Sequence, residues 1–292
     1  MTLQLTVAAR TDTGRVRRIN EDAFLVADVE RGALGDAPGA HQFEVGPRGA
    51  LLAVSDGMGG HKAGEVASAL TLASLYRALA GERPPPDSGP VDSDALVERA
   101  VKVANRDVYE AALQPGREKM GATLTAVLVD EAGAHIAEIG DSRAYLIRDG
   151  AIRQVTHDQS YVQVLLDVGA IAPEEASQSP MRSVILQAMG QKPRVAVALG
   201  RLALRWGDCL LLCTDGLSGA LAPEELHAVV KSAADLHAAC DRLVAIANER
   251  GGDDNITVLL AKVSGDLPVP APGERIEDTF DVLRSFDAPI ER

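Results

Sequence analysis

The sequence predicts an α+β fold, in which antiparallel strands form sheets and the helices are segregated around them. Apolar runs separated by short turns follow one another between residues 122 and 156, a pattern typical of antiparallel strands. Helical periodicity occurs instead in separate blocks, near residues 61–80, 94–113 and 222–250. Strands in runs and helices in runs favour a layered α+β arrangement over alternating strand–helix units.

The first third of the chain contains two expected strands and two expected helices. The runs "DAFLVAD" and "GALLAVSD" predict strands, separated by a Gly/Pro-rich loop at residues 31–49. A helical stripe through Val66, Leu70 and Ala73 follows. Three consecutive prolines exclude helix from the next segment and indicate a surface loop. A second helix is expected at residues 94–113, with Ser93 as its N-cap.

The rest of the chain continues this alternation of blocks. Residues 122–156 predict a meander of antiparallel strands, and residues 159–190 predict a mostly helical excursion with a helix start at Pro173. Strands are expected in "RVAVALGRLAL", "GDCLLLCTD" and "NITVLLAKV", with two amphipathic helices at 222–250. In the tail, Ile276, Phe280 and Leu283 fall at helical spacing. A disordered tail, and a tail docked on the domain or on a partner, both remain open.

Composition excludes several classes of protein. The formal net charge of −13 argues against a nucleic-acid partner, because such surfaces are basic. No apolar stretch approaches membrane-spanning length and no export signal precedes the first strand, so we expect a soluble cytoplasmic protein without a membrane partner. The three cysteines lack metal-ligand spacing, which predicts buried reduced thiols.

Four acidic residues share one sequence context, next to apolar strands and small residues. They are Asp56 in "SDG", Asp141 in "GDSRAY", Asp215 in "TDG" and Asp254 in "GGDDNIT". Each alone is typical of a tight turn. If all four meet at one edge of a sheet, their repulsion requires cations between them. Oxygen ligands without a Cys/His set favour Mg²⁺ or Mn²⁺, and two such ions would acidify a water and hold an anionic substrate.

Two further groups extend this hypothesis. Arg17 and Glu21 are four residues apart, which is also the spacing of a helical ion pair on a solvated face. Because a strand follows directly, Arg17 is alternatively suited to bidentate phosphate contact beside the carboxylates. His61, which follows two glycines, is a candidate for protonating a leaving alkoxide.

Six motifs together carry a resemblance to a known family. "RRINEDA", "SDGMGGHKAGEVAS", "MGATLTAV", "GDSRAYLIRDG", "TDGLSG" and "GGDDNIT" occur in the order and approximate spacing of the metal-dependent Ser/Thr protein phosphatases of type 2C (PPM), in their bacterial form. The resemblance covers about residues 5–263. It implies a four-layer αββα sandwich, with two antiparallel sheets flanked by helices and a flap subdomain at about 159–190. A phosphatase domain at 1–263 and a linker and tail at 264–292 would result.

The resemblance also implies a role for individual residues. It makes Asp56 the ligand that bridges two Mn²⁺ or Mg²⁺ ions, with the carbonyl of Gly57 on one ion. The remaining implied residues are Asp215 and Asp254 on the other ion, Glu21 and Asp22 on metal-bound waters, Arg17 on the substrate phosphate, His61 as acid, and Asp141, Asp215 and the Ser183 carbonyl at a third, weaker metal site. The implied reaction is hydrolysis of phosphoserine and phosphothreonine in proteins, opposing Ser/Thr kinases, with phosphoproteins including those kinases as partners.

Two departures and two rival functions accompany this interpretation. The flap opens with "HDQS" where relatives usually have a "DHS" segment, so the family's flap contacts do not carry over directly. Asp253 adds an acid beside Asp254 that either attracts an additional cation or faces solvent, and we expect it to face solvent. A non-catalytic phosphoprotein-binding role would require lost ligands, and the acidic residues are all present. Hydrolysis of a small phosphate ester is compatible with the same site.

Overall fold

The computed structural model describes residues 2–33, 41–60, 63–82, 91–117 and 119–287. Its centre is a pair of antiparallel sheets. The first has the order β10 (Ala151–Gln154), β9 (Arg143–Arg148), β12 (Cys209–Cys213), β13 (Ile256–Gly265), β1 (Leu3–Asp12) and β4 (His41–Glu44). The second has the order β14 (Phe280–Arg284), β11 (Ala198–Leu202), β8 (Gly133–Ile139), β7 (Leu124–Asp130), β5 (Ala50–Met58), β2 (Asp22–Asp28) and β3 (Gly32–Ala33), with β6 (Gly121–Ala122) on the end of β5.

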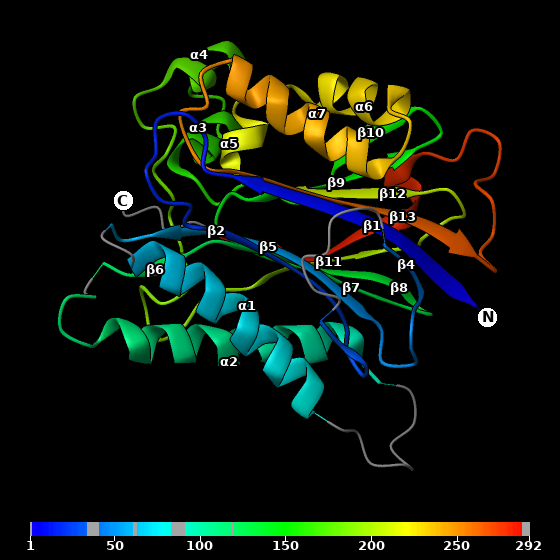
Figure 1. The fold of residues 1–292 in the computed structure, drawn as a ribbon, viewed down its shortest axis with the longest axis horizontal. Helices are drawn as coiled ribbons and strands as arrows, with labels where there is room; N and C mark the ends of the chain where they lie inside the picture. The colour runs from blue at the N-terminus through cyan, green and yellow to red at the C-terminus, as the bar shows by residue number, and fades with distance from the viewer. Residues whose placement is uncertain (1, 34–40, 61–62, 83–90, 118, 288–292) are drawn as a thin grey trace.

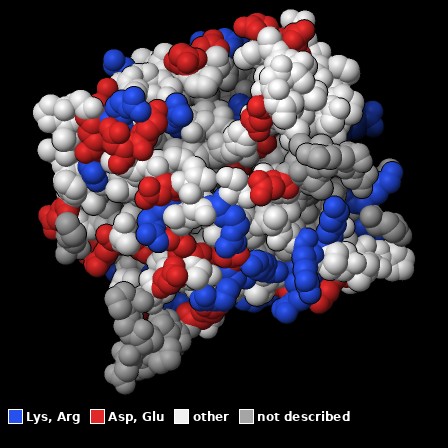
Figure 2. Space-filling view, turned by 180° about the vertical axis from the view of Figure 1, so that it is seen from behind, with Lys and Arg blue, Asp and Glu red and all other residues white. Residues whose placement is uncertain are grey.

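Helices cover the outer face of each sheet and complete four layers (Figure 1). The helices α1 (Ala63–Gly81) and α2 (Ser93–Ala112) lie on the second sheet, and α6 (Pro223–Ser232) and α7 (Leu236–Glu249) lie on the first. The predicted architecture of two antiparallel sheets flanked by helices is therefore confirmed. None of the described helices is long and apolar enough to cross a membrane. On the face drawn in Figure 2, basic and acidic side chains are interspersed.

The strand β5 shows why its sequence is apolar without interruption. Leu52 and Val54 point into the core between the two sheets, whereas Leu51 and Ala53 point toward α1 and α2. All four side chains are buried. A strand with packed layers on both sides has no polar face, so its sequence loses the usual alternation. The strand β12 is buried along its whole length, and β13 along its first part, in the same way.

Several local expectations are corrected by long-range contacts. The predicted meander at 122–156 is divided, because β7 and β8 belong to the second sheet while β9 and β10 belong to the first. The loop expected at 31–49 contains β3 and β4, and its residues 34–40 lie outside the described chain. The N-cap of α2 is Asp92, which accepts a hydrogen bond from the amide of Ala95, whereas Ser93 Oγ donates to Asp130.

The predicted helical excursion at 159–190 is helical only in its first part. It contains α3 (Tyr161–Asp167) and α4 (Pro173–Gln178), and residues 179–190 form turns and isolated bridges. The predicted helix start at Pro173 is confirmed. The segment 83–90, which holds the three prolines, lies outside the described residues.

The C-terminal segment packs on the sandwich. The helix predicted from Ile276, Phe280 and Leu283 is wrong, because a short 3-10 helix, η1 (Ile276–Thr279), leads into β14, which pairs with β11. Ile276 and Phe280 pack against the core between the sheets. The expected domain boundary near residue 263 stays a prediction, but the described part of the tail is docked on its own chain (Figure 1).

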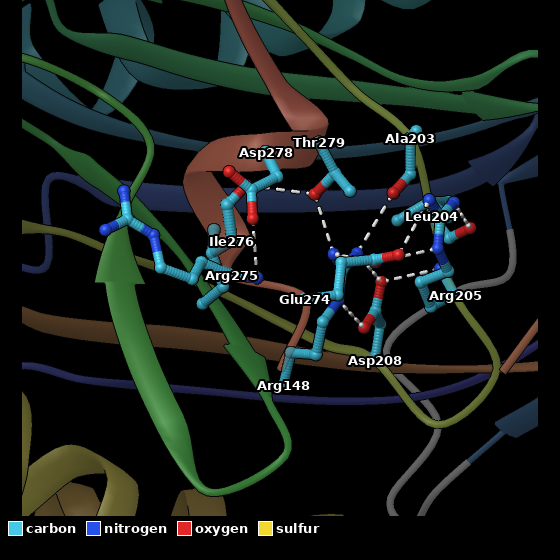
Figure 3. Close-up of polar contacts among 10 residues, drawn as sticks. All are labelled: Arg148, Ala203, Leu204, Arg205, Asp208, Glu274, Arg275, Ile276, Asp278 and Thr279. Carbon is cyan, nitrogen blue, oxygen red and sulfur yellow. Dashed lines mark hydrogen bonds and ion pairs between the residues drawn. The ribbon is translucent and has the colours of Figure 1, made fainter. Parts of the chain in front are cut away.

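A buried ion-pair network fastens this segment (Figure 3). Arg148 at the end of β9 makes two 2.7 Å hydrogen bonds to the Asp208 carboxylate, donates to Thr279 Oγ1 at 2.6 Å and lies 3.3 Å from Glu274. Arg205 donates to the same Glu274 at 2.8 Å. The side chains of Arg148 and Asp208 are at most 1% exposed. Glu274 and Thr279 belong to the tail, and both contact the buried Arg148. The part of the tail that carries them is therefore part of the folded core.

Candidate active site

Five carboxylates lie close together, with Asp56 next to the other four. They come from both sheets and from the short helix α5 (Asp215–Ser218). Asp22 begins β2 and is paired in register with Asp56 near the end of β5. Asp141 follows β8 in the short crossover to β9, Asp215 follows β12 as the first residue of α5, and Asp254 precedes β13. The two sheets therefore bring together acids that are far apart in sequence, as the sequence predicts.

Burial and mutual repulsion disfavour the charged forms of these acids. Burial raises the pKa of Asp22 to about 7 and that of Asp215 to about 6, and the charge of Asp254 adds to both effects. Burial, followed by the charge of Asp215, raises the pKa of Asp141 to about 8. The pKa of Asp56 lies well above its ordinary value, because it is buried next to Asp22, Asp215 and Asp141. The cluster thus favours bound protons or bound cations.

The donor atoms fit a hard divalent cation. Buried oxygens of Asp22 (Oδ1) and Asp215 (Oδ1) have no hydrogen-bond partner, and a buried orphan oxygen is unfavourable unless something binds it. Among the described residues, no group of three or more His, Cys, Asp or Glu side chains is placed to hold a metal ion through these side chains alone. An open, oxygen-only set with room for water matches Mg²⁺ and Mn²⁺, which keep part of their hydration shell.

Local structure explains how Asp22 and Gly57 are placed. The hydroxyls of Thr214 and Thr257 both donate to Asp22 Oδ2 at 2.7 Å, which leaves Oδ1 free. At Gly57, a Cβ atom would lie 2.0 Å from the Gly64 carbonyl oxygen, so only glycine lets α1 approach β5 this closely. The role of the Gly57 carbonyl as a ligand stays a prediction.

Arg17 lies at the edge of the acidic cluster. Its Nη2 donates to Asp254 Oδ2 at 2.7 Å, and about half of its side chain is exposed. Residues 13–21 form no helix, so the alternative of a helical ion pair with Glu21 is wrong. The Glu21 carboxylate instead lies against Gly64, where an added Cβ would come within 2.4 Å of it. Arg17 therefore combines an acidic neighbour with access to solvent.

A cavity of about 700 Å³ opens between the flap and the segment after β12. Asp141, Asp215, Asp254 and Ser183 all line it, so four of the expected site residues share one cavity. Asp253 lines it as well and is exposed, as expected. His61 lies outside the described residues, so its expected role stays a prediction.

The altered flap entry "HDQS" forms specific contacts. Asp158 accepts three hydrogen bonds from Arg143, and the Gln159 side chain accepts from the amide of Gly140 and donates to the carbonyl of Glu138. These bonds tie the root of the flap to the crossover that carries Asp141. The departure from "DHS" thus leaves the flap entry fixed to the site.

Comparison with known proteins identifies the family. The family model described as "Protein phosphatase 2C" matches residues 36–260. The chain belongs to the protein phosphatase 2C family. Its relatives include the serine/threonine protein phosphatase PstP of Mycobacterium tuberculosis, 39% identical over 264 residues, and the serine/threonine phosphatase stp of Listeria monocytogenes, 33% identical over 261. These matches cover 90% and 87% of this chain. The chain spans 46% of the first protein's length and 94% of the second's.

Solved structures of this family share the fold. The crystal structure of the M. tuberculosis phosphatase is 37% identical and has a TM-score of 0.74, covering 90% of this chain and 100% of its own. The serine/threonine phosphatase of S. agalactiae is 30% identical with a TM-score of 0.76, covering 88% and 98%. A second structure of the M. tuberculosis catalytic domain, 37% identical with a TM-score of 0.73 and the same coverage as the first, is described as a complex with two manganese ions. The expected family and fold class are confirmed.

Several residues around the acidic cluster are not predicted from the sequence. They are Thr214 and Thr257, which hold Asp22, Arg143, which holds Asp158, and Asn255. A hydroxyl before "DG" is visible at Thr214, but its partner is 192 positions away in sequence. Such contacts leave no local pattern, because they arise only when the two sheets are packed together.

Proposed function

We propose that this protein hydrolyses phosphoserine and phosphothreonine in proteins in a metal-dependent reaction, opposing Ser/Thr kinases in bacterial signalling. The observation that carries the proposal is the set of buried carboxylates with raised pKa values and orphan oxygens, next to the solvent-accessible Arg17. The relatives, which are named as serine/threonine phosphatases, support the same reaction.

The proposed ligands follow from the placement of the acids. Asp56 would bridge two Mn²⁺ or Mg²⁺ ions with help from the Gly57 carbonyl, and Asp215 and Asp254 would complete the second position. Glu21 and Asp22 would act through metal-bound waters, and a third ion would involve Asp141, Asp215 and the Ser183 carbonyl, all three of which line the same cavity. Bound ions at such a site supply an acidified water and neutralise an anionic substrate.

The protein's own groups orient the substrate. Arg17 would leave part of its contact with Asp254 to hold the phosphate through its planar fork, and His61 would protonate the leaving serine or threonine oxygen. A cysteine nucleophile is disfavoured, because burial raises the pKa of Cys209, Cys213 and Cys240 to about 12. All three thiols are free and buried, as expected. Direct attack by water on phosphorus is therefore the favoured route.

Turnover of a phosphothreonine peptide with and without metal tests this proposal. Activity is expected only with added Mn²⁺ or Mg²⁺, and Asp215→Asn is expected to reduce kcat/KM at least about 100-fold, since loss of supporting residues around metals alone costs 10–100-fold. Asp107→Asn on α2, whose carboxylate pairs with Arg77, is the matched control and should retain full activity. Full activity of Asp215→Asn, or in the presence of EDTA, would contradict the proposal.

The substrate class requires a second comparison. Parallel assays with nucleotides and sugar phosphates separate a protein phosphatase from an enzyme acting on small esters, and faster turnover of the small esters would favour the latter. Phosphoproteins, including Ser/Thr kinases, are the partners we propose, and a cytoplasmic location is part of the same proposal.

A further inference from the structure

The side chain of Asn255 connects the strand β13 to the segment that carries Arg17. Its Nδ2 donates to the carbonyl oxygens of Thr13 at 2.9 Å and Ile19 at 3.0 Å, and its Oδ1 accepts from the amide of Glu21 at 2.8 Å. The residue is 5% exposed. One buried amide thus uses three of its hydrogen-bonding positions on the backbone of residues 13–21, here called the arginine loop.

The arginine loop is packed closely on the segment before β13. Gly14 has φ +78°, and a Cβ there would lie 2.2 Å from the Asp254 carbonyl oxygen. The amides of Arg15 and Val16 donate to the Gly252 carbonyl at 2.8 and 3.2 Å. The loop has no secondary structure of its own. Its shape therefore depends on contacts with the rest of the chain, and Asn255 bonds its backbone near both ends.

We propose that Asn255 is a positioning residue for phosphate binding, which fixes the arginine loop so that Arg17 stays beside Asp254 and Glu21 stays at the acidic cluster. This inference rests on the proposed phosphatase function. Asn255 acts through the backbone and touches no reacting atom. Arg17 lies between the two carbonyls to which Asn255 donates, so release of either end changes where the guanidinium points. Geometry errors of this kind reduce catalysis even when every catalytic side chain is present.

The primary test compares Asn255→Ala with a matched control. Asn105→Ala removes a 1% exposed asparagine whose amide bonds the backbone at Gly190 and Lys192, on the side of α2 and away from the arginine loop. Asn255→Ala is expected to lower kcat/KM for a phosphothreonine peptide about 10–100-fold and to weaken inhibition by inorganic phosphate. The control variant is expected to lose stability with less than a threefold change in kcat/KM.

A double-mutant cycle with Arg17→Ala separates positioning from a general loss of structure. If Asn255 acts through Arg17, Asn255→Ala causes a much smaller fold-loss in the Arg17→Ala background than in the wild-type protein. An equal fold-loss in both backgrounds, or a change in stability alone, would overturn the inference. Asn255→Asp keeps the side-chain volume and the oxygen that accepts from the amide of Glu21, but it loses the two hydrogen bonds donated to the carbonyls of Thr13 and Ile19. This variant replaces Asn255→Ala in the test if the alanine variant does not fold.

Hydrogen exchange provides a readout that does not depend on activity. Amides in residues 13–21, including that of Glu21, are expected to exchange at least tenfold faster in Asn255→Ala than in the wild type, and unchanged protection there would also overturn the inference. A wild-type protein without metal-dependent turnover would refute the proposed function, whereas an active wild type with an unaffected Asn255→Ala variant would refute only this inference.

Discussion

The two ends of β9 lie next to two different buried clusters of charge. Before its first residue, Asp141 belongs to a group of carboxylates whose pKa values are raised by burial and by one another. At its last residue, Arg148 pairs with Asp208 and Glu274, so buried carboxylates there are matched by buried guanidinium groups (Figure 3). Acids neutralised by the protein's own cations serve the fold, whereas acids without enough such cations prepare a site for a ligand.

Removal of the arginine is expected to have the largest effect on stability. Arg148→Met leaves Asp208 buried without its partner and should reduce the free energy of unfolding by about 3–5 kcal/mol, measured by urea denaturation. The control is Arg153→Met, which breaks an ion pair with Glu277 that is more than a third exposed on both sides and should cost at most about 1 kcal/mol. Equal effects of the two substitutions would contradict the distinction between the clusters.

Added metal should raise the free energy of unfolding by binding at the acidic cluster, and the network around Arg148 should not contribute to this gain. Mn²⁺ at a hundred times its dissociation constant is expected to raise the free energy of unfolding by about 2.7 kcal/mol, because it binds only the folded state. Thermal unfolding with and without Mn²⁺ measures this increment. The Arg148→Met variant should retain this Mn²⁺-induced increase, and the Asp215→Asn variant should lose most of it. The reverse pattern would show that Mn²⁺ binds at the network around Arg148 and not at the acidic cluster.

The metal-free protein should become less stable as the pH rises. The pKa values of Asp22, Asp215 and Asp141 are raised to about 7, 6 and 8 by burial and neighbouring charges. The folded state therefore binds more protons than the unfolded state between pH 4 and 8, and the free energy of unfolding falls with increasing pH, by on the order of 2–3 kcal/mol between pH 6 and 7 alone. Saturating Mn²⁺ should flatten this slope, and a metal-free protein that gains stability over that range would contradict the shifts.

The smallest expected effect concerns a hydroxyl next to the cluster. Thr257→Val removes one of two hydroxyl donors to Asp22 and should weaken Mn²⁺ binding up to about tenfold, with a loss of stability near 1 kcal/mol. Calorimetric titration measures the affinity. Thr71→Val in α1 removes a buried hydroxyl that has no hydrogen-bond partner, and it should leave Mn²⁺ affinity unchanged. A similar affinity in both variants would show that Thr257 does not orient Asp22.

The sequence predicts the acidic cluster better than the network around Arg148. Four acids of the cluster stand beside an apolar strand and a small residue, so a repeated local pattern indicates them, whereas Asp22 is indicated only by the resemblance to the family. Arg148 sits in "LIRDG", which reads as the end of a hairpin strand, and nothing near it in sequence indicates that Asp208 and Glu274 will surround it. Burial of an ion pair depends on how distant segments pack, which periodicity does not encode.

The same distinction applies to the fold. Strand and helix positions are largely predictable, because their apolar periods are local. Assignment of β8 and β9 to different sheets is not, since a short connection at residues 140–142 looks like a turn within one sheet. In the tail, three apolar residues at helical spacing were misleading, because Ile276 and Phe280 enter the core from a short helix and a strand.

The pairing of β1 with β13 has a consequence for the order of folding. Thr11 contacts Thr257, 246 positions later, and β13 lies between β1 and β12 in the first sheet. During synthesis, β1 must remain without this neighbour until the segment after residue 256 has left the ribosome. Contacts between residues so far apart in sequence form slowly. Until β13 is available, chaperones or incorrect strand partners can bind the unpaired edge of β1. Neither Arg17 nor Asp254 can take its final place beside the other until that late step is complete.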